Sequence, residues 1–195
     1  MGKIFCVMGK SSSGKDTIYK RVLEREELGL KRIVPYTTRP IRKNEAEGVE
    51  YHFVDAARRD ALMEQGKIIE IRSYHTIHGI WDYFTVDDGE IDLAHQDYLL
   101  IGTLDTYEKL RKYYGFQKIC PIYIEVEDGV RLERALQRER KQTKPKYEEM
   151  CRRFLADQKD FSEDRIKALE ITEVFQNDVL EDTVETVVEF IKAHR

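Results

Sequence analysis

The feature that most constrains this chain is a glycine-rich loop close to its N-terminus. Residues 9–17 read Gly-Lys-Ser-Ser-Ser-Gly-Lys-Asp-Thr, directly after the apolar run Ile4–Met8 and before a stretch of helical composition. Glycines let successive backbone N–H groups turn inward, and the following helix directs its positive end to the same point. The pattern Gly-x-x-x-x-Gly-Lys between a strand and a helix predicts a site for the phosphates of a nucleotide.

The loop supplies a complete set of expected ATP contacts. These are Gly9, Ser11, Ser12, Ser13, Gly14, Lys15, Asp16 and Thr17. Lys15 follows the second glycine, so its ammonium group is expected to reach the outer phosphates. The next position commonly carries a hydroxyl that binds Mg²⁺, but here it is Asp16. This carboxylate either holds Mg²⁺ as a hard oxygen ligand or stabilises the first turn of the helix.

Composition limits the classes of protein that need to be considered. The 195 residues suffice for one well-buried domain, and the net charge of −4 argues against a surface that wraps a nucleic-acid polymer. Cys6, Cys120 and Cys151 are far apart in the sequence, which predicts reduced, structural thiols. Neither a signal-like N-terminus nor an apolar run of the ~18 residues needed for a membrane helix is found. We therefore expect a cytoplasmic protein without a membrane partner.

The pattern of apolar runs predicts how the chain is organised. The helix after the loop is expected to end near residues 28–29, and an insert begins at Pro35. Within the insert we expect a strand at 50–54, a helix at 55–66 and a strand at 67–71.

The remainder of the chain reads as alternating strands and helices. Apolar runs at 98–101 and 119–126 predict buried parallel strands, with a helix at 104–113 between them. A charged helical region is expected at 129–168 with a break at 142–145, followed by a strand near 174–175 and a final amphipathic helix. This alternation predicts an α/β fold with a doubly wound parallel sheet.

A second group of residues suits a phosphate dianion. Arg39 and Arg42 lie on one loop, and Tyr51 follows on an expected strand. Guanidinium groups bind phosphate oxygens through paired N–H donors, and a phenol adds another donor.

Together with the phosphate loop, residues 37–54 resemble the guanylate kinase family. The family's nucleotide-binding insert carries Thr-Thr-Arg-x-x-Arg-x-x-Glu followed by Gly-x-x-Tyr-x-Phe-Val, and the resemblance extends over most of the chain. It implies the P-loop nucleoside monophosphate (NMP) kinase fold and assigns Arg39, Arg42 and Tyr51 to the phosphate of the acceptor GMP. The implied parts are a core at 1–34, 86–133 and 154–195, an NMP-binding insert at 35–85 and a helical lid at 134–153.

The resemblance also implies how the base is recognised. Glu70 occupies the place of the family glutamate that accepts hydrogen bonds from guanine. An ionised carboxylate only accepts hydrogen bonds, so it selects a base edge that offers donors, as guanine does and adenine does not.

Several family positions differ in this chain. The serine that reads the guanine oxygen is replaced by Pro35, which leaves Tyr36 as the candidate substitute. The acidic pair of the next core strand falls on Ile101 and Thr103, of which Thr103 stays a candidate acceptor contact. The family's Tyr-Gly-Ser element is replaced by residues 77–81, which gives His78 the tyrosine's phosphate contact.

The basic region that begins at Arg131 predicts a mobile lid. The family's lid arginines fall on Arg134 and Arg138 on the entering helix, with Arg140 as a competitor, and on Arg153 on the leaving helix. Because phosphoryl transfer requires positioning and charge neutralisation, we expect Lys15, Arg134, Arg138 and Arg153 to be the catalytic residues. Arg131 and Arg140 are expected on a solvated helix face.

The expected function is phosphoryl transfer from ATP, with Mg²⁺, to an NMP, with GMP or dGMP as the acceptor. The Gly-Lys-Asp loop also resembles ribose 1,5-bisphosphate phosphokinases; Pro35 and Thr103 favour that alternative, while Glu70 and Tyr51 disfavour it. A third alternative is a non-catalytic guanylate kinase-like module that binds a phosphopeptide. The presence of Lys15 and the lid arginines disfavours this alternative. The expected state is a monomer or homodimer.

Overall fold

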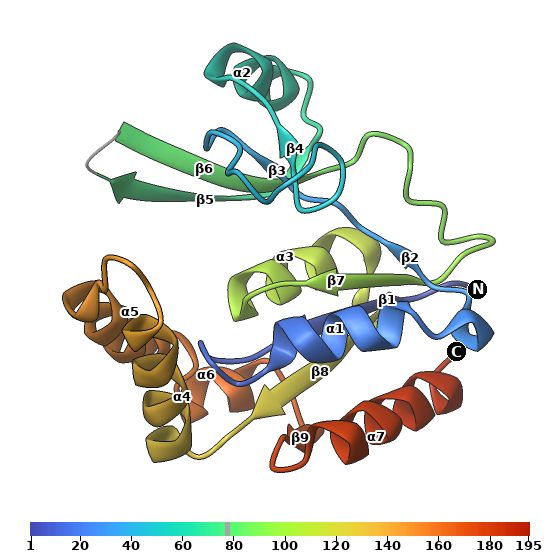
Figure 1. The fold of residues 1–195 in the computed structure, drawn as a ribbon. Coiled ribbons are helices and arrows are strands. Elements are labelled where there is room, and N and C mark those ends of the chain that lie inside the picture. Colours follow the sequence, from blue (N-terminus) through green and yellow to red (C-terminus); the bar gives the residue numbers. More distant parts are fainter. Residues whose placement is uncertain (77–78) are drawn as a thin grey trace.

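The computed structural model describes residues 1–76 and 79–195, and its core is a five-stranded sheet in the order β2-β7-β1-β8-β9 (Figure 1). All neighbouring strands are parallel, which confirms the predicted doubly wound parallel sheet. The strands are β1 (Ile4–Met8), β2 (Lys31–Arg32), β7 (Tyr98–Ile101), β8 (Ile119–Glu125) and β9 (Val174–Gln176). The chain passes to one side of β1 for β2 and β7 and to the other side for β8 and β9, so the loop after β1 lies where the strand order reverses.

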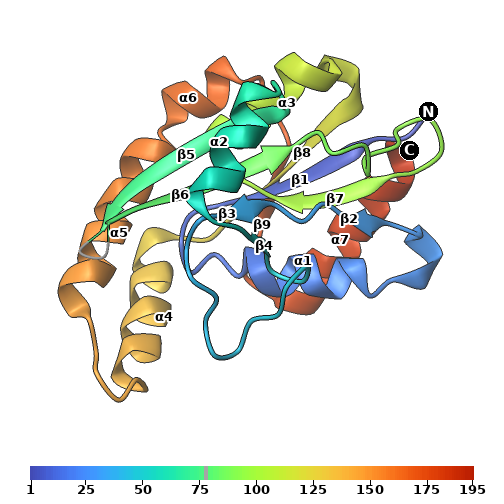
Figure 2. The same ribbon diagram turned by 90° about the horizontal axis from the view of Figure 1, so that it is seen from above.

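Helices cover both faces of this sheet (Figure 2). Phe5 and Val7 of β1 pack toward α1 (Lys15–Leu23) and α7 (Leu180–Ala193), whereas Ile4, Cys6 and Met8 face α3 (Leu104–Tyr114) and α6 (Glu163–Ala168). All five residues of β1 are buried because successive side chains alternate between two covered faces. Burial raises the pKa of Cys6 to about 12, as expected for a structural thiol.

The insert builds a second sheet above the first, in the order β4-β3-β6-β5 (Figure 1). Its elements are β3 (Tyr36–Thr37), β4 (His52–Phe53), α2 (Ala56–Glu64), β5 (Ile68–Thr76) and β6 (Gly79–Val86). Strand β5 is longer than the predicted strand at 67–71, and β6 was not predicted. Both differences have one cause, because β5 and β6 form an antiparallel pair whose partners stabilise each other across the strands.

The predicted end of the first helix is corrected. Helix α1 ends at Leu23 rather than near residues 28–29, and a 3-10 turn at Glu26–Leu28 follows. This turn carries Leu28 into the cluster beneath α1 and α7, where it is fully buried. The charged helical region has the expected break, between α4 (Asp128–Arg140) and α5 (Tyr147–Asp160).

A second break in that region separates α5 from α6. Phe161 ends α5, is buried, and stacks on Tyr123 of β8 with ring centroids 5.8 Å apart. Within the described residues, none of the helices has the length and apolar character to cross a membrane.

Candidate active site

The phosphate loop joins the end of β1 to the start of α1, as predicted. Gly14 precedes α1 with a φ of 84°, a backbone conformation that favours glycine. A side-chain carbon at Gly14 would lie less than 3.0 Å from the Asn177 amide, and one at Gly9 less than 3.0 Å from the Ile124 carbonyl. Both glycines are therefore required by close packing as well as by the turn.

Replacing Gly14 with alanine is expected to lower the affinity for ATP at least about tenfold and to destabilise the fold by about 2 kcal/mol. The left-handed conformation alone costs about 1–2 kcal/mol for a residue with a side chain, and the Asn177 amide must also move. Gly89→Ala is the matched control, since its φ of 87° is similar but nothing lies within 4 Å of the added carbon. Calorimetric titration with ATP and thermal unfolding measure both effects. An equal loss of ATP affinity in the two variants would contradict the packing argument.

Two hydroxyls of the loop have no partner among the described residues. Ser12 Oγ and Ser13 Oγ are buried without a hydrogen bond, and Ser12 has a φ of 65°. The Asn177 side-chain amide donates to the Ser13 carbonyl at 2.7 Å and so fixes the outer side of the loop. Buried polar groups are normally satisfied, so unpaired hydroxyls in a phosphate-type loop indicate a polar ligand.

Lys15 and Asp16 lie together at the start of α1. Lys15 Nζ is 3.2 Å from Asp16 Oδ2, and the lysine side chain is 18% exposed while the aspartate side chain is 72% exposed. Among the described residues there is no cluster of three or more His, Cys, Asp or Glu side chains that could hold a metal by itself. The site fits a cation that takes one ligand from the Asp16 carboxylate and the others from phosphate oxygens and water.

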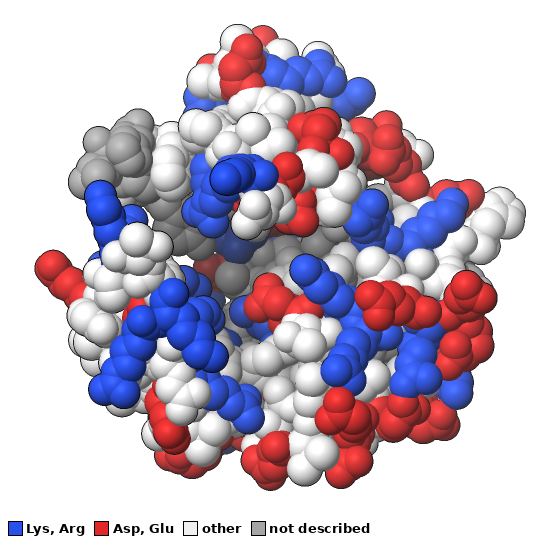
Figure 3. Space-filling model, in the orientation of Figure 1, with Lys and Arg blue, Asp and Glu red and all other residues white. Residues whose placement is uncertain are grey.

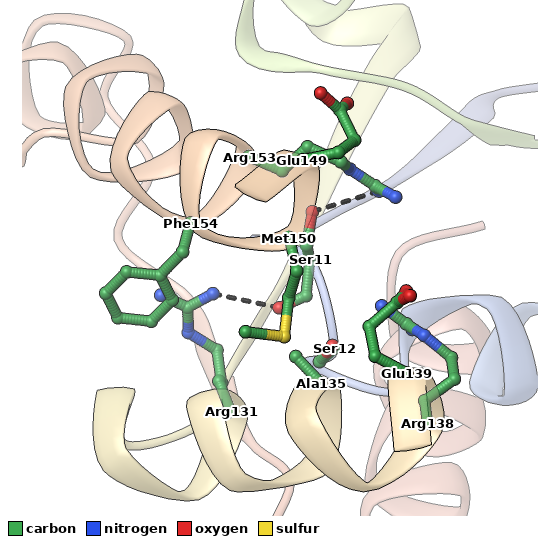
Figure 4. Close-up of a pocket in the computed structure, with 10 residues that line it drawn as sticks. All are labelled: Ser11, Ser12, Arg131, Ala135, Arg138, Glu139, Glu149, Met150, Arg153 and Phe154. Atoms are coloured by element: carbon green, nitrogen blue, oxygen red, sulfur yellow. Dashed lines mark hydrogen bonds between the residues drawn. The ribbon is translucent and has the colours of Figure 1, made fainter. Parts of the chain in front are cut away.

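Helices α4 and α5 contact the N–H, the carbonyl and the hydroxyl of Ser11, and Figure 4 shows the two contacts made by arginines. The Ser11 N–H donates to Asp157 at 2.7 Å, its carbonyl accepts from Arg131 at 2.8 Å, and its hydroxyl accepts from Arg153 at 3.2 Å. Arg153 thus contacts the loop, and its part in phosphoryl transfer stays a prediction. Sequence reasoning missed Asp157, because the acid lies 146 residues from Ser11 and no local pattern links them.

The position of Arg131 differs from the prediction. It is 1% exposed, although a solvated position was predicted. Its guanidinium bonds Asp128 at 2.6 Å and lies 4.8 Å from the centre of the Phe154 ring (Figure 4). Arg131 is therefore a buried support of the loop, because α4 turns this side chain toward α5 rather than toward solvent.

The other arginines of α4 remain nearer the solvent. Arg134 is partly buried and lies 3.4 Å from the Asn177 carbonyl. Arg138 is exposed and lines a small pocket with Arg153 and Ser12. Arg140 is exposed, as expected. Figure 3 shows Lys and Arg side chains gathered over this part of the surface, beside the hollow under the insert.

The insert brings together the residues predicted to hold the acceptor phosphate. Arg39 is 3% exposed, bonds Glu45 through both Nη atoms at 2.8 Å, and lies 5.3 Å from the centre of the Tyr51 ring. Its Nε donates to the Tyr83 hydroxyl at 3.1 Å, a neighbour that sequence reasoning missed. Arg42 is exposed on the same loop. Burial raises the pKa of Tyr51, so its hydroxyl is a donor at neutral pH.

Glu70 lies near the start of β5. It is 2% exposed, accepts a hydrogen bond from Thr85 at 3.0 Å, and is 3.2 Å from Arg72 Nε. The Tyr36 hydroxyl donates to Asp88 at 3.0 Å, and its role as the substitute donor beside Glu70 stays a prediction. The buried position of Glu70 agrees with a recognition role and excludes a solvent-facing one.

Two further predicted acceptor contacts, those of Thr103 and His78, stay predictions. The Thr103 hydroxyl caps α3 by accepting from the Thr106 N–H at 3.3 Å, so its contact with an acceptor stays a prediction. His78 lies outside the described residues.

Comparison with known proteins decides the family. The family model described as guanylate kinase matches residues 1–194. The chain belongs to the guanylate kinase family. A guanylate kinase of Neisseria gonorrhoeae is 36% identical over 104 residues, and one of Thermus thermophilus is 38% identical over 73 residues.

These sequence matches are partial. They cover 53% of this chain and 48% of the Neisseria protein, and 37% of this chain and 32% of the Thermus protein. Among solved structures, the guanylate kinase from Anaplasma phagocytophilum is similar with a TM-score of 0.69 and 20% identity, over 98% of this chain and 85% of that one. The structural similarity confirms the predicted kinase fold.

Proposed function

We propose that this guanylate kinase family member transfers the terminal phosphoryl group of ATP to GMP or dGMP. The observation that carries the proposal is the arrangement along β5 and β6. Glu70 pairs with Thr85 in the register of these strands, and Arg72 pairs with Tyr83, whose hydroxyl contacts Arg39. The strand pair that carries a carboxylate suited to guanine therefore also contacts a cluster suited to phosphate, which is the combination a nucleoside monophosphate requires.

The acceptor phosphate would be held by Arg39, Arg42 and Tyr51, joined by Tyr83. We infer that Tyr83-Phe84-Thr85, rather than residues 77–81, corresponds to the family's Tyr-Gly-Ser element, because Tyr83 lies at Arg39 and Thr85 lies at Glu70. No general base is needed, since a phosphate dianion is a competent nucleophile at neutral pH.

The transferred phosphoryl group would be stabilised by Lys15 and by the arginines near the loop. Arg153 already contacts Ser11, and Arg134 and Arg138 lie on the facing helix. We take residues 134–153 as the lid, 35–85 as the NMP-binding insert, and 1–34, 86–133 and 154–195 as the core. Closure of the lid would exclude water, which otherwise competes with the acceptor.

Mg²⁺ would accompany ATP, with Asp16 and the neighbouring Thr17 as the protein's oxygen donors. Bound there, the ion would neutralise phosphate charge as phosphoryl transfer proceeds. The residues fit this role because both lie in the first turn of α1, and the Asp16 carboxylate is 3.2 Å from the Lys15 ammonium group.

An acceptor panel tests the proposal. ADP formation would be measured with ATP and Mg²⁺ in the presence of GMP, dGMP, AMP, CMP, UMP, dTMP or ribose 1,5-bisphosphate. We expect GMP or dGMP to exceed every other acceptor in kcat/KM. Turnover of ribose 1,5-bisphosphate alone would replace the proposal with the sugar-phosphate alternative, and the absence of any turnover would favour a binding module.

Glu70→Gln is expected to lower kcat/KM for GMP about 10²-fold and to leave the value for AMP nearly unchanged. The amide can accept only one of the two guanine hydrogen bonds and places a donor against the other, and an unpaired buried group costs about 1–3 kcal/mol. Glu64→Gln, an exposed change on α2, is the matched control. The variants would be compared by steady-state kinetics with both acceptors. An equal loss for GMP and AMP would show that Glu70 does not read the base.

A further inference from the structure

A guanidinium group lies beside the predicted base-reading carboxylate. Arg72 follows Glu70 by two residues on β5, so both side chains leave the same face of the strand. Arg72 Nε is 3.2 Å from Glu70 Oε2, and the arginine side chain is 22% exposed while that of Glu70 is 0% exposed. The arginine is therefore the partly exposed member of a pair whose carboxylate is fully buried.

The donors around Glu70 are almost all committed. Thr85 donates its only hydroxyl proton to Glu70, the Tyr36 hydroxyl donates to Asp88, and Pro35 has no side-chain donor. Arg72 uses Nε on Glu70, and its Nη groups have no hydrogen-bond partner within the described part of the chain. Arg72 is thus the group that can still donate to a ligand next to the carboxylate.

The Watson–Crick edge of guanine fits this pair of charges. It presents the N1–H and 2-amino donors beside the 6-oxo acceptor, and an arginine fork binds the O6 and N7 atoms of guanine in the commonest specific protein–base contact. We propose that Arg72 is the specificity-determining residue that donates to the 6-oxo group of the acceptor while Glu70 accepts from its N1–H and 2-amino groups. This inference rests on the proposed function and names the residue that reads the oxygen.

The same geometry explains rejection of adenine. Adenine carries a 6-amino donor in place of the oxygen, so it would direct N–H groups at the Arg72 guanidinium and leave an acceptor facing the Glu70 carboxylate. Both contacts would be repulsive or unpaired, and specificity arises from such mismatches as much as from good contacts.

The test compares GMP with 6-thio-GMP, which keeps the N1–H and 2-amino donors but has a weakly accepting sulfur at position 6. Dissociation constants without ATP and kcat/KM values with ATP would be measured for the wild type, Arg72→Ala and Arg72→Lys. Lys109→Ala is the control, since Lys109 contacts the Ile71 carbonyl on the same strand but not Glu70. Thermal unfolding checks that each variant folds, and Arg72→Lys retains a positive charge for Glu70 if the alanine variant does not fold.

We expect the wild type and Lys109→Ala to bind GMP at least about tenfold more tightly than 6-thio-GMP. Arg72→Ala should lower the affinity for GMP about 10- to 100-fold and the affinity for 6-thio-GMP much less. The ratio of the two dissociation constants should therefore come near one. Arg72→Lys should lower the ratio less than alanine does, because an ammonium lacks the planar fork.

Two results would overturn the inference. If Arg72→Ala weakens the binding of GMP, 6-thio-GMP and ribose 5-phosphate equally, the arginine holds the phosphate rather than the base. If a folded Arg72→Ala variant keeps the wild-type ratio, the arginine only balances the charge of Glu70. Failure of the proposed function would look different, since the wild-type protein would then form no GDP even where GMP binds.

Discussion

Replacing Lys15 with methionine is expected to lower kcat about 10³-fold while the affinity for GMP stays unchanged. Lys15 begins α1 directly after the phosphate loop, and its side chain is mostly shielded from solvent. Its charge would neutralise the oxygens of the group in transfer, an interaction that strengthens as the transition state forms. The proposed acceptor site lies on the insert and does not include Lys15, so GMP binding should not change.

The control for this result is Lys20→Met, which removes an exposed lysine from the last turn of the same helix. Single-turnover measurements would separate the chemical step from product release, and calorimetric titration would report GMP binding. We expect the Lys20 variant to match the wild-type rate. A less than tenfold loss in the Lys15 variant would contradict its assigned role.

Replacing Arg39 with alanine is expected to destabilise the fold by about 3 kcal/mol. Arg39 is a buried cation with a two-bond ion pair to Glu45, a bond to Tyr83 and a bond to the Pro40 carbonyl at 2.9 Å. Removing one member of a buried pair leaves the other charged group without its partner, which costs more than the pair itself contributes. Denaturant unfolding measures the change, and Arg42→Ala is the matched control because Arg42 is exposed on the same loop.

The loss of folding stability caused by Arg39→Ala should depend on pH. The hydrogen-bonded Arg39 guanidinium lowers the pKa of Glu45 in the folded protein. A lowered carboxyl pKa contributes stability above the unfolded value of about 4.3, and that contribution is lost as the pH falls through the folded pKa. The difference in unfolding free energy between the wild type and Arg39→Ala should therefore narrow below about pH 4. A pH-independent difference would contradict the ion-pair explanation.

The parts that could be predicted from the sequence are those set by local patterns. The phosphate loop depends on glycines at fixed spacing between a strand and a helix, and the core strands are continuous apolar runs covered on both faces. The break between α4 and α5 follows from a polar segment with a proline. The arrangement of Arg39, Tyr51 and Glu70 on the insert was likewise expected, from family resemblance.

The parts that could not be predicted depend on partners distant in the sequence. β6 is rich in β-branched and aromatic residues, but Tyr83 and Thr85 gain their places only through the register of β6 with β5, which no local pattern contains. Arg131 resembles its exposed neighbours in sequence, but the packing of α4 against α5 buries it. Asp157 reaches Ser11 through the same packing, which no local pattern contains.

The most direct test of the central claim is phosphorus NMR of the protein with ATP, Mg²⁺ and GMP. We expect the resonances of ADP and GDP to grow together in equal amounts, without inorganic phosphate, and AMP in place of GMP to give far slower change. Consumption of ATP with release of inorganic phosphate and no GDP, or no consumption of ATP at all, would contradict the central claim.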